Sequence, residues 1–289
     1  MTQIINSLAE VSADYDVLFC DLWGCLHNGV AAYPAAVAAL QAFRAKGGQV
    51  VLLTNAPRPW KYVAAQLDRM GVPKDAWDVI VSSGDAAQDA MFAGAVGRKV
   101  WAIAMDKDQG FFADVPPEWQ HAPAIERVSL EEAEGIVCCG LFDDETETPE
   151  DYRAWLTTAQ ERGMKLLCAN PDVIVDLGEK RLYCAGALAE FYEDLGGQSL
   201  YFGKPHAPIY ELARKRLDLA EDARILAVGD GIPTDIPGAR AQGIDALFVT
   251  GGLAFDQFGA DVENPVREKL EEWLSMRSEA PRYSIGRLR

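Results

Sequence analysis

Short apolar runs that alternate with helical patterns constrain the fold of this chain more than any other feature. Runs typical of buried strands occupy residues 17–20, 49–53 and 79–82. Apolar residues at helical spacing lie between these runs, first around Leu40 and then around Leu67. Strands separated by helices of this length predict right-handed βαβ units and a parallel sheet. The sequence therefore predicts an α/β protein.

The alternation is interrupted and later resumes, which indicates two domains. A second series begins at Gly84, with strand-like runs at 99–103, 135–139 and 165–168. The pattern of the first series returns near Tyr201. A chain of 289 residues is long enough for two cores. We predict a core domain of residues 1–83 and 199–289, interrupted by a second α/β domain of residues 84–198. The tail from Ser278 shows no pattern and is expected to be extended or mobile.

Charge and cysteine usage exclude several classes of protein. The 44 acidic residues against 27 basic ones give a formal charge of −17, which argues against a nucleic-acid binder. No apolar stretch approaches the roughly 20 residues that span a membrane. The first residues do not show a basic region followed by an apolar run, so we expect no secretory signal. The six cysteines form no C-x-x-C pair, which is typical of reduced structural thiols. We expect a cytoplasmic protein that binds neither nucleic acid nor membrane, although one pocket can still bind a phosphorylated small molecule.

Polar side chains follow several predicted strands, at the edge of a parallel sheet where ligands bind. They are Asp21, Thr54, Asn55, Asp230 and Asp235, with Lys204 just ahead of a predicted helix. Carboxylates are hard oxygen ligands that suit Mg²⁺. Thr54 and Lys204 could hold phosphate oxygens, and Asp21 could attack phosphorus. The set predicts phosphate chemistry.

Four motifs resemble those of the haloacid dehalogenase superfamily. They read Asp21-Leu-Trp-Gly-Cys, Leu53-Thr-Asn55, Gly203-Lys-Pro205 and Gly229-Asp-Gly-Ile-Pro-Thr-Asp235. The chain is similar to the branch with a large α/β cap between the second and third motifs, which contains the N-acetylglucosamine-operon phosphatase and 4-nitrophenyl phosphatases. The resemblance implies a Rossmann-like core with an inserted C2-type cap. It also implies Mg²⁺-dependent hydrolysis of small phosphate monoesters, such as sugar phosphates, through an aspartyl-phosphate.

The resemblance also implies roles for individual residues. Asp21 would be the nucleophile and a Mg²⁺ ligand, and Thr54 and Lys204 would bind the transferring phosphoryl group. The remaining metal ligands would be the backbone carbonyl of Trp23, Asp230, and Asp235 directly or through water. The residues implied around phosphate and substrate are Trp23, Gly24, Thr54, Asn55 and Lys204, with Asn170 and Asp172 from a cap segment that a simple proline turn explains equally well.

Trp23 is the main departure from the family pattern. The family's phosphatases carry at this position an aspartate that protonates the leaving alcohol and later activates water, which indole cannot do. Positioned acid–base catalysis contributes about 10²–10⁴-fold, so we expect a slow enzyme. His27 is the nearest substitute acid or base, but His27-Asn-Gly29 is also typical of a tight turn, the reading we favour.

Two functions therefore stay open at this point. The first is a Mg²⁺-dependent phosphatase, and the second is a non-catalytic module that binds Mg²⁺ and a phosphorylated metabolite. Cys25 is expected to pack in the core because no partner residue accompanies it. A homodimer through the cap is one assembly that the resemblance allows, and the sequence does not reveal the substrate.

Overall fold

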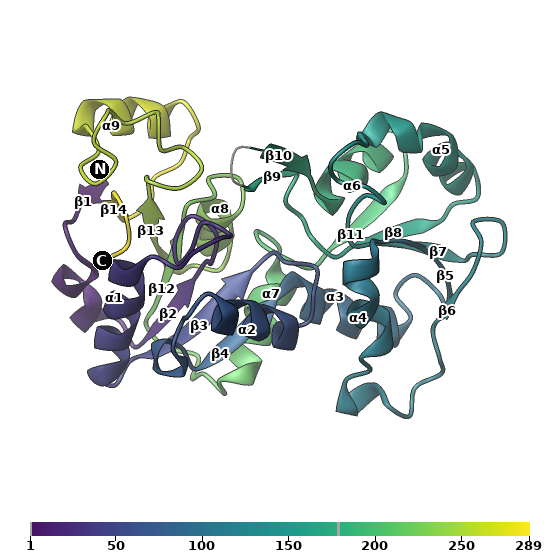
Figure 1. Ribbon diagram of the computed structural model, residues 1–289, viewed down its shortest axis with the longest axis horizontal. Coiled ribbons are helices and arrows are strands. Elements are labelled where there is room, and N and C mark those ends of the chain that lie inside the picture. Colours follow the sequence, from purple (N-terminus) through teal and green to yellow (C-terminus); the bar gives the residue numbers. More distant parts are fainter. Residues whose placement is uncertain (1, 178–179) are drawn as a thin grey trace. The chain divides into compact units, whose positions relative to one another are not determined.

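The computed structural model describes residues 2–177 and 180–289 and divides into two compact units (Figure 1). The core unit comprises the chain up to Thr54, Ala64–Val81 and Tyr210–Arg289. The insert unit comprises Asn55–Val63 and Ser82–Ile209. The predicted second domain, 84–198, lies wholly inside the insert unit, which continues for several more residues to Ile209.

A seven-stranded sheet forms the centre of the core unit, with strand order β1-β14-β13-β12-β2-β3-β4. Its strands are β1 (Gln3–Ile4), β2 (Val17–Cys20), β3 (Gln49–Thr54), β4 (Val79–Ser82), β12 (Ile225–Gly229), β13 (Asp245–Val249) and β14 (Tyr283–Ile285). β2 pairs in parallel with both β3 and β12, and β12 pairs in parallel with β13. The predicted α/β class with a parallel sheet is confirmed.

Helices cover the sheet of the core unit. They are α1 (Pro34–Ala45), α2 (Trp60–Arg69), α7 (Ala207–Arg216), α8 (Asp235–Ala241) and α9 (Arg267–Ser275), with 3₁₀ turns at Leu8–Glu10, Ser12–Asp14 and Lys74–Ala76. Ala227 and Phe19 are register partners, so their side chains share one face of the sheet. On that face Phe19 meets Tyr210 of α7, and Ala227 packs in a cluster with residues of α8 and α9.

The C-terminal tail contributes the strand β14 to this sheet, so of the two expected forms, extended or mobile, this part of the tail is extended. β14 pairs in parallel with β13 on one side and β1 on the other. Tyr283, Ser284 and Ile285 are all buried. Three residues are too few to display the period of two from which a strand is predicted, so the tail gave no signal.

The insert unit is a second α/β layer structure. Its five-stranded parallel sheet has the order β11-β8-β7-β5-β6, and β9 and β10 form a separate antiparallel hairpin. The strands are β5 (Lys99–Ile103), β6 (Glu126–Arg127), β7 (Gly135–Cys138), β8 (Lys165–Cys168), β9 (Ile174–Leu177), β10 (Lys180–Tyr183) and β11 (Gln198–Tyr201). The helices are α3 (Ser83–Ala93), α4 (Gln109–Ala113), α5 (Arg153–Glu161) and α6 (Ala185–Asp194), with 3₁₀ turns at Asp106–Asp108, Pro117–Trp119 and Pro149–Tyr152.

Alternate residues of the central strands feed two separate cores in the insert unit. Ile136 and Leu166 pack with α5 and α6 on one face, whereas Val137 and Leu167 pack with α3 and α4 on the other. This period of two is that of a strand buried on both faces. Within the described residues, no helix combines the length and the apolar character needed to cross a bilayer.

Candidate active site

The strand order of the core sheet reverses at β2. The next strand in the sequence, β3, pairs with one side of β2, whereas β12 pairs with the other. Such a switch point is where ligands bind in an open parallel sheet. Asp21 follows β2, Thr54 ends β3, and Asp230 follows β12. The structure thus brings three of the predicted site residues to one edge of the sheet.

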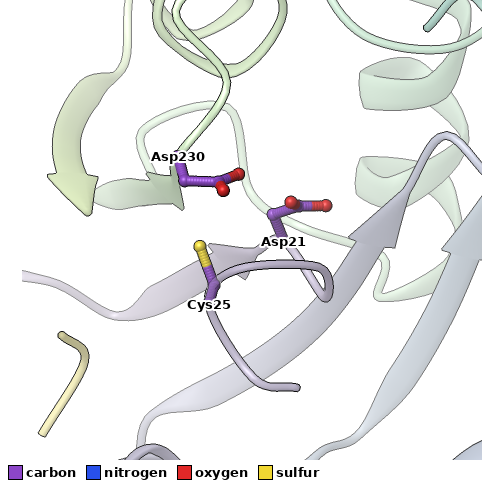
Figure 2. A group of neighbouring side chains, drawn as sticks. All are labelled: Asp21, Cys25 and Asp230. Atoms are coloured by element: carbon purple, nitrogen blue, oxygen red, sulfur yellow. The ribbon is translucent and has the colours of Figure 1, made fainter. Parts of the chain in front are cut away.

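Asp21, Cys25 and Asp230 form a group of potential metal ligands at this edge (Figure 2). One ligand atom from each, two carboxylate oxygens and the Sγ atom, all lie within 4.8 Å of one another. All three residues are buried, with exposed fractions of 8% or less. Two buried carboxylates so close together repel each other unless positive charge lies between them, so this donor set fits a divalent cation.

The backbone at two glycines fixes the carboxylate of Asp230. A Cβ atom added at Gly24 or at Gly252 would overlap with Oδ2 of Asp230. The same oxygen accepts a hydrogen bond from the backbone N–H of Leu253 over 2.8 Å. Gly24 also has a φ of +71°, which other residues rarely adopt. Asp230 is therefore held in a narrow slot between two backbone segments.

Asp235 lies outside the three-residue group and stabilises the loop after β12. Its Oδ2 atom accepts a hydrogen bond from the backbone N–H of Gly231 over 3.0 Å. A Cβ atom at Gly229 would overlap with its carboxyl carbon, so the side chain packs directly on this strand end. The prediction that Asp235 contributes to a metal site, directly or through water, stays a prediction.

Cys25 is the member of the group that sequence reasoning missed. Burial raises the pKa of its thiol well above the ordinary value, and the carboxylates of Asp230 and Asp21 add to the effect. The thiol is therefore protonated at neutral pH when no cation is near. The signal that could have found it is its position four residues after Asp21, in a turn that leads back toward that carboxylate.

Trp23 and His27 face each other in the turn after β2. Their ring centroids lie 5.4 Å apart with the planes at 72°. His27 is buried, and its Nδ1 atom accepts a hydrogen bond from the backbone N–H of Gly29 over 3.0 Å. Burial lowers the pKa of His27 to about 4, so the ring is neutral at pH 7 and carries no imidazolium proton to give. The geometry favours the turn role for His27.

The other predicted site residues lie in the insert unit, where hydrogen bonds join them. Asn55 Oδ1 accepts the backbone N–H of Lys204 over 2.7 Å, and Asn55 Nδ2 donates to the Lys204 carbonyl over 3.1 Å and to Asp172 Oδ1 over 2.8 Å. Asn170 Oδ1 accepts the backbone N–H of Asp172 over 3.0 Å. Because both Nδ2 hydrogens of Asn55 are used, its side chain positions Lys204, and a contact with phosphate would need its backbone N–H.

Sequence and structure both relate this chain to a known family. A family model described as haloacid dehalogenase-like hydrolase matches residues 18–115, and a second of the same kind matches residues 201–266. A solved haloacid dehalogenase-like hydrolase from Brucella suis is 37% identical, with 99% of this chain and 100% of that chain covered and a TM-score of 0.84. The chain belongs to the haloacid dehalogenase-like hydrolases.

Further solved structures share the fold at lower identity. A glycerol phosphate phosphatase from Mycobacterium tuberculosis, solved with magnesium, is 26% identical over 87% of this chain and 73% of that one, with a TM-score of 0.65. A 4-nitrophenylphosphatase from Thermotoga maritima is 19% identical over 95% of each chain, with a TM-score of 0.70. Among curated proteins, none matches the chain significantly. The fold and the family expected from the four motifs are confirmed.

Proposed function

We propose that this haloacid dehalogenase-like hydrolase is a Mg²⁺-dependent phosphatase that acts on small phosphate monoesters, such as sugar phosphates. The observation that carries the proposal is the pair of buried carboxylates, Asp21 and Asp230, at the switch point of the core sheet. The similar structures of a glycerol phosphate phosphatase and a 4-nitrophenylphosphatase support it.

In the proposed mechanism the carboxylate of Asp21 is the nucleophile. One of its oxygens bonds to phosphorus while the bond from phosphorus to the leaving oxygen breaks, and the leaving oxygen takes a proton from water. Water then attacks the aspartyl-phosphate, which restores Asp21 and releases inorganic phosphate. The side chains of Thr54 and Lys204 would bind the phosphoryl oxygens, as the family resemblance implies.

The metal would be held by Asp21 and Asp230, with the carbonyl of Trp23 as a further oxygen donor. When bound, Mg²⁺ neutralises charge on the phosphate oxygens and aligns the phosphoryl group for in-line attack. A cation held between the two carboxylates would also offset the repulsion between them.

Trp23 shapes both steps of this mechanism. Its indole neither protonates the leaving oxygen nor activates the water that attacks the aspartyl-phosphate, and the low pKa of His27 makes that residue a poor replacement. Substrates whose leaving group needs no protonation, such as acyl phosphates and nitrophenyl phosphate, should therefore react fastest. The missing groups cost about 10²–10⁴-fold in rate when nothing replaces them.

The same substitution favours a second candidate function. A chain that keeps the metal-binding carboxylates and lacks the acid–base aspartate could bind Mg²⁺ and a phosphorylated metabolite without turning it over. A homodimer through the insert unit stays a prediction for either function, and gel filtration tests it.

Steady-state hydrolysis of 4-nitrophenyl phosphate with and without Mg²⁺ separates the two functions. We expect Mg²⁺-dependent activity in the wild type, none above background in Asp21→Asn, and unchanged activity in the control Asp222→Asn, which alters an exposed carboxylate. Activity that survives Asp21→Asn would refute the nucleophile. An inert wild type that binds Mg²⁺ and phosphate by calorimetry would establish the binding module instead.

A further inference from the structure

The turn between Asp21 and His27 carries a thiol back to the metal-binding carboxylates. The backbone N–H groups of Leu26 and His27 both donate to the carbonyl of Leu22, over 2.8 and 3.0 Å, which closes a single tight turn. Cys25 lies in this turn and is almost fully buried. In Figure 2 its Sγ atom points toward Asp230.

The spacing of the three donor atoms suits a shared cation. Metal–ligand bonds of about 2.0 to 2.3 Å allow two donors of one ion to lie up to about twice that distance apart. The three atoms lie within 4.8 Å of one another. Small rotations of side chains would therefore bring all three donors to one ion without a change of the backbone.

Sulfur and oxygen donors differ in the cations that they prefer. Carboxylates suit Mg²⁺, Ca²⁺ and Mn²⁺, whereas thiolates select softer ions such as Zn²⁺. We propose that Cys25 is a sulfur ligand in this centre and raises its affinity for thiophilic divalent cations, Zn²⁺ and Cd²⁺ above all. The proposal rests on the metal site of the proposed function. Coordination would form a metal–sulfur bond and release the thiol proton to water.

The consequence is a centre that two classes of cation compete to occupy. Zn²⁺ bound through Cys25 would occupy the oxygen donors that Mg²⁺ needs and so inhibit a Mg²⁺-dependent reaction. Replacement of the sulfur by oxygen should weaken the binding of these softer cations and so reduce the competition.

Titration of the metal-stripped protein with Cd²⁺ tests the proposal without any turnover. Cadmium bound to sulfur absorbs in the ultraviolet through charge transfer, and all six cysteines are buried thiols, so surface thiols do not obscure the signal. We expect a band that saturates at one equivalent in the wild type, is absent in Cys25→Ser, and is retained in the control Cys139→Ala. Calorimetry should show that Cys25→Ser lowers the affinity for Cd²⁺ about tenfold or more. Loss of a residue that only supports a metal ligand already has an effect of this size.

The outcomes separate this proposal from the proposed function. Absence of the band in the wild type, or its persistence in Cys25→Ser and in Cys25→Ala, would overturn the sulfur ligand. Hydrolysis of 4-nitrophenyl phosphate with Mg²⁺, measured on the same samples, reports on the phosphatase alone. A wild type that shows the band but does not hydrolyse 4-nitrophenyl phosphate would support Cys25 as a ligand and refute the phosphatase function.

Discussion

Asn55 holds the peptide backbone of Lys204 from both sides. Its Oδ1 atom accepts the N–H of Lys204 over 2.7 Å, and its Nδ2 atom donates to the carbonyl of the same residue over 3.1 Å. The two residues are 149 positions apart in the sequence, and both are buried. The orientation of the Lys204 side chain therefore depends on an amide from the second motif.

Removal of this amide should disturb the position of Lys204 and lower the stability of the fold. Asn55→Ala leaves the buried N–H and carbonyl of Lys204 without these partners, which costs about 1–3 kcal/mol for each such group. We expect a lower free energy of unfolding in urea and a lower kcat/KM. The control Asn264→Ala, which removes only an exposed bond to Asp261, should change neither. Wild-type values for both quantities in Asn55→Ala would contradict the positioning role.

The close packing around Asp230 predicts that one methyl group added at Gly252 weakens Mg²⁺ binding. Gly252→Ala places a Cβ atom where Oδ2 of Asp230 lies, so the carboxylate must move. We expect the Mg²⁺ affinity measured by calorimetry to fall by about 10–100-fold, the range for a lost supporting contact. At Gly140 an added Cβ atom meets nothing within 4 Å, so Gly140→Ala is the matched control. Equal affinities in the two variants would show that Asp230 is not held in this way.

The low pKa of His27 predicts a loss of stability in acid. Its pKa falls from 6.5 to about 4 on folding, so the unfolded chain binds the proton first as the pH drops below 6.5. The contribution is complete above that pH and disappears as the pH approaches 4, a difference of roughly 3 kcal/mol. Urea unfolding at several pH values should show this slope in the wild type and a smaller one in His27→Asn, which keeps an acceptor for Gly29. Equal slopes in the wild type and His27→Asn would show that another group causes the loss of stability in acid.

The parallel sheet and the positions of its chemical groups followed from local pattern. Apolar runs that end in Asp21 and Asp230 predict both the strands and the edge at which these carboxylates lie, because parallel strands share one carboxyl edge. The metal ligation and catalytic roles of these residues remain predictions.

Two features of the structure depend on contacts between distant segments and gave no local signal. β14 exists because β13 and β1 flank it, and the use of both amide hydrogens of Asn55 depends on Lys204 and Asp172. Tertiary pairing, rather than periodicity or composition, decides features of this kind.

The fate of the phosphoryl group on Asp21 tests the proposed reaction most directly. Because Trp23 does not activate water, the aspartyl-phosphate should break down slowly and accumulate. Wild-type protein mixed with Mg²⁺ and acetyl phosphate, quenched in acid and mapped by mass spectrometry, should carry phosphate on the peptide that contains Asp21. Trp23→Asp should turn over faster and retain less phosphate, and Asp21→Asn should retain none. Hydrolysis of acetyl phosphate without a phosphorylated Asp21, or with phosphate on another residue, would contradict the mechanism.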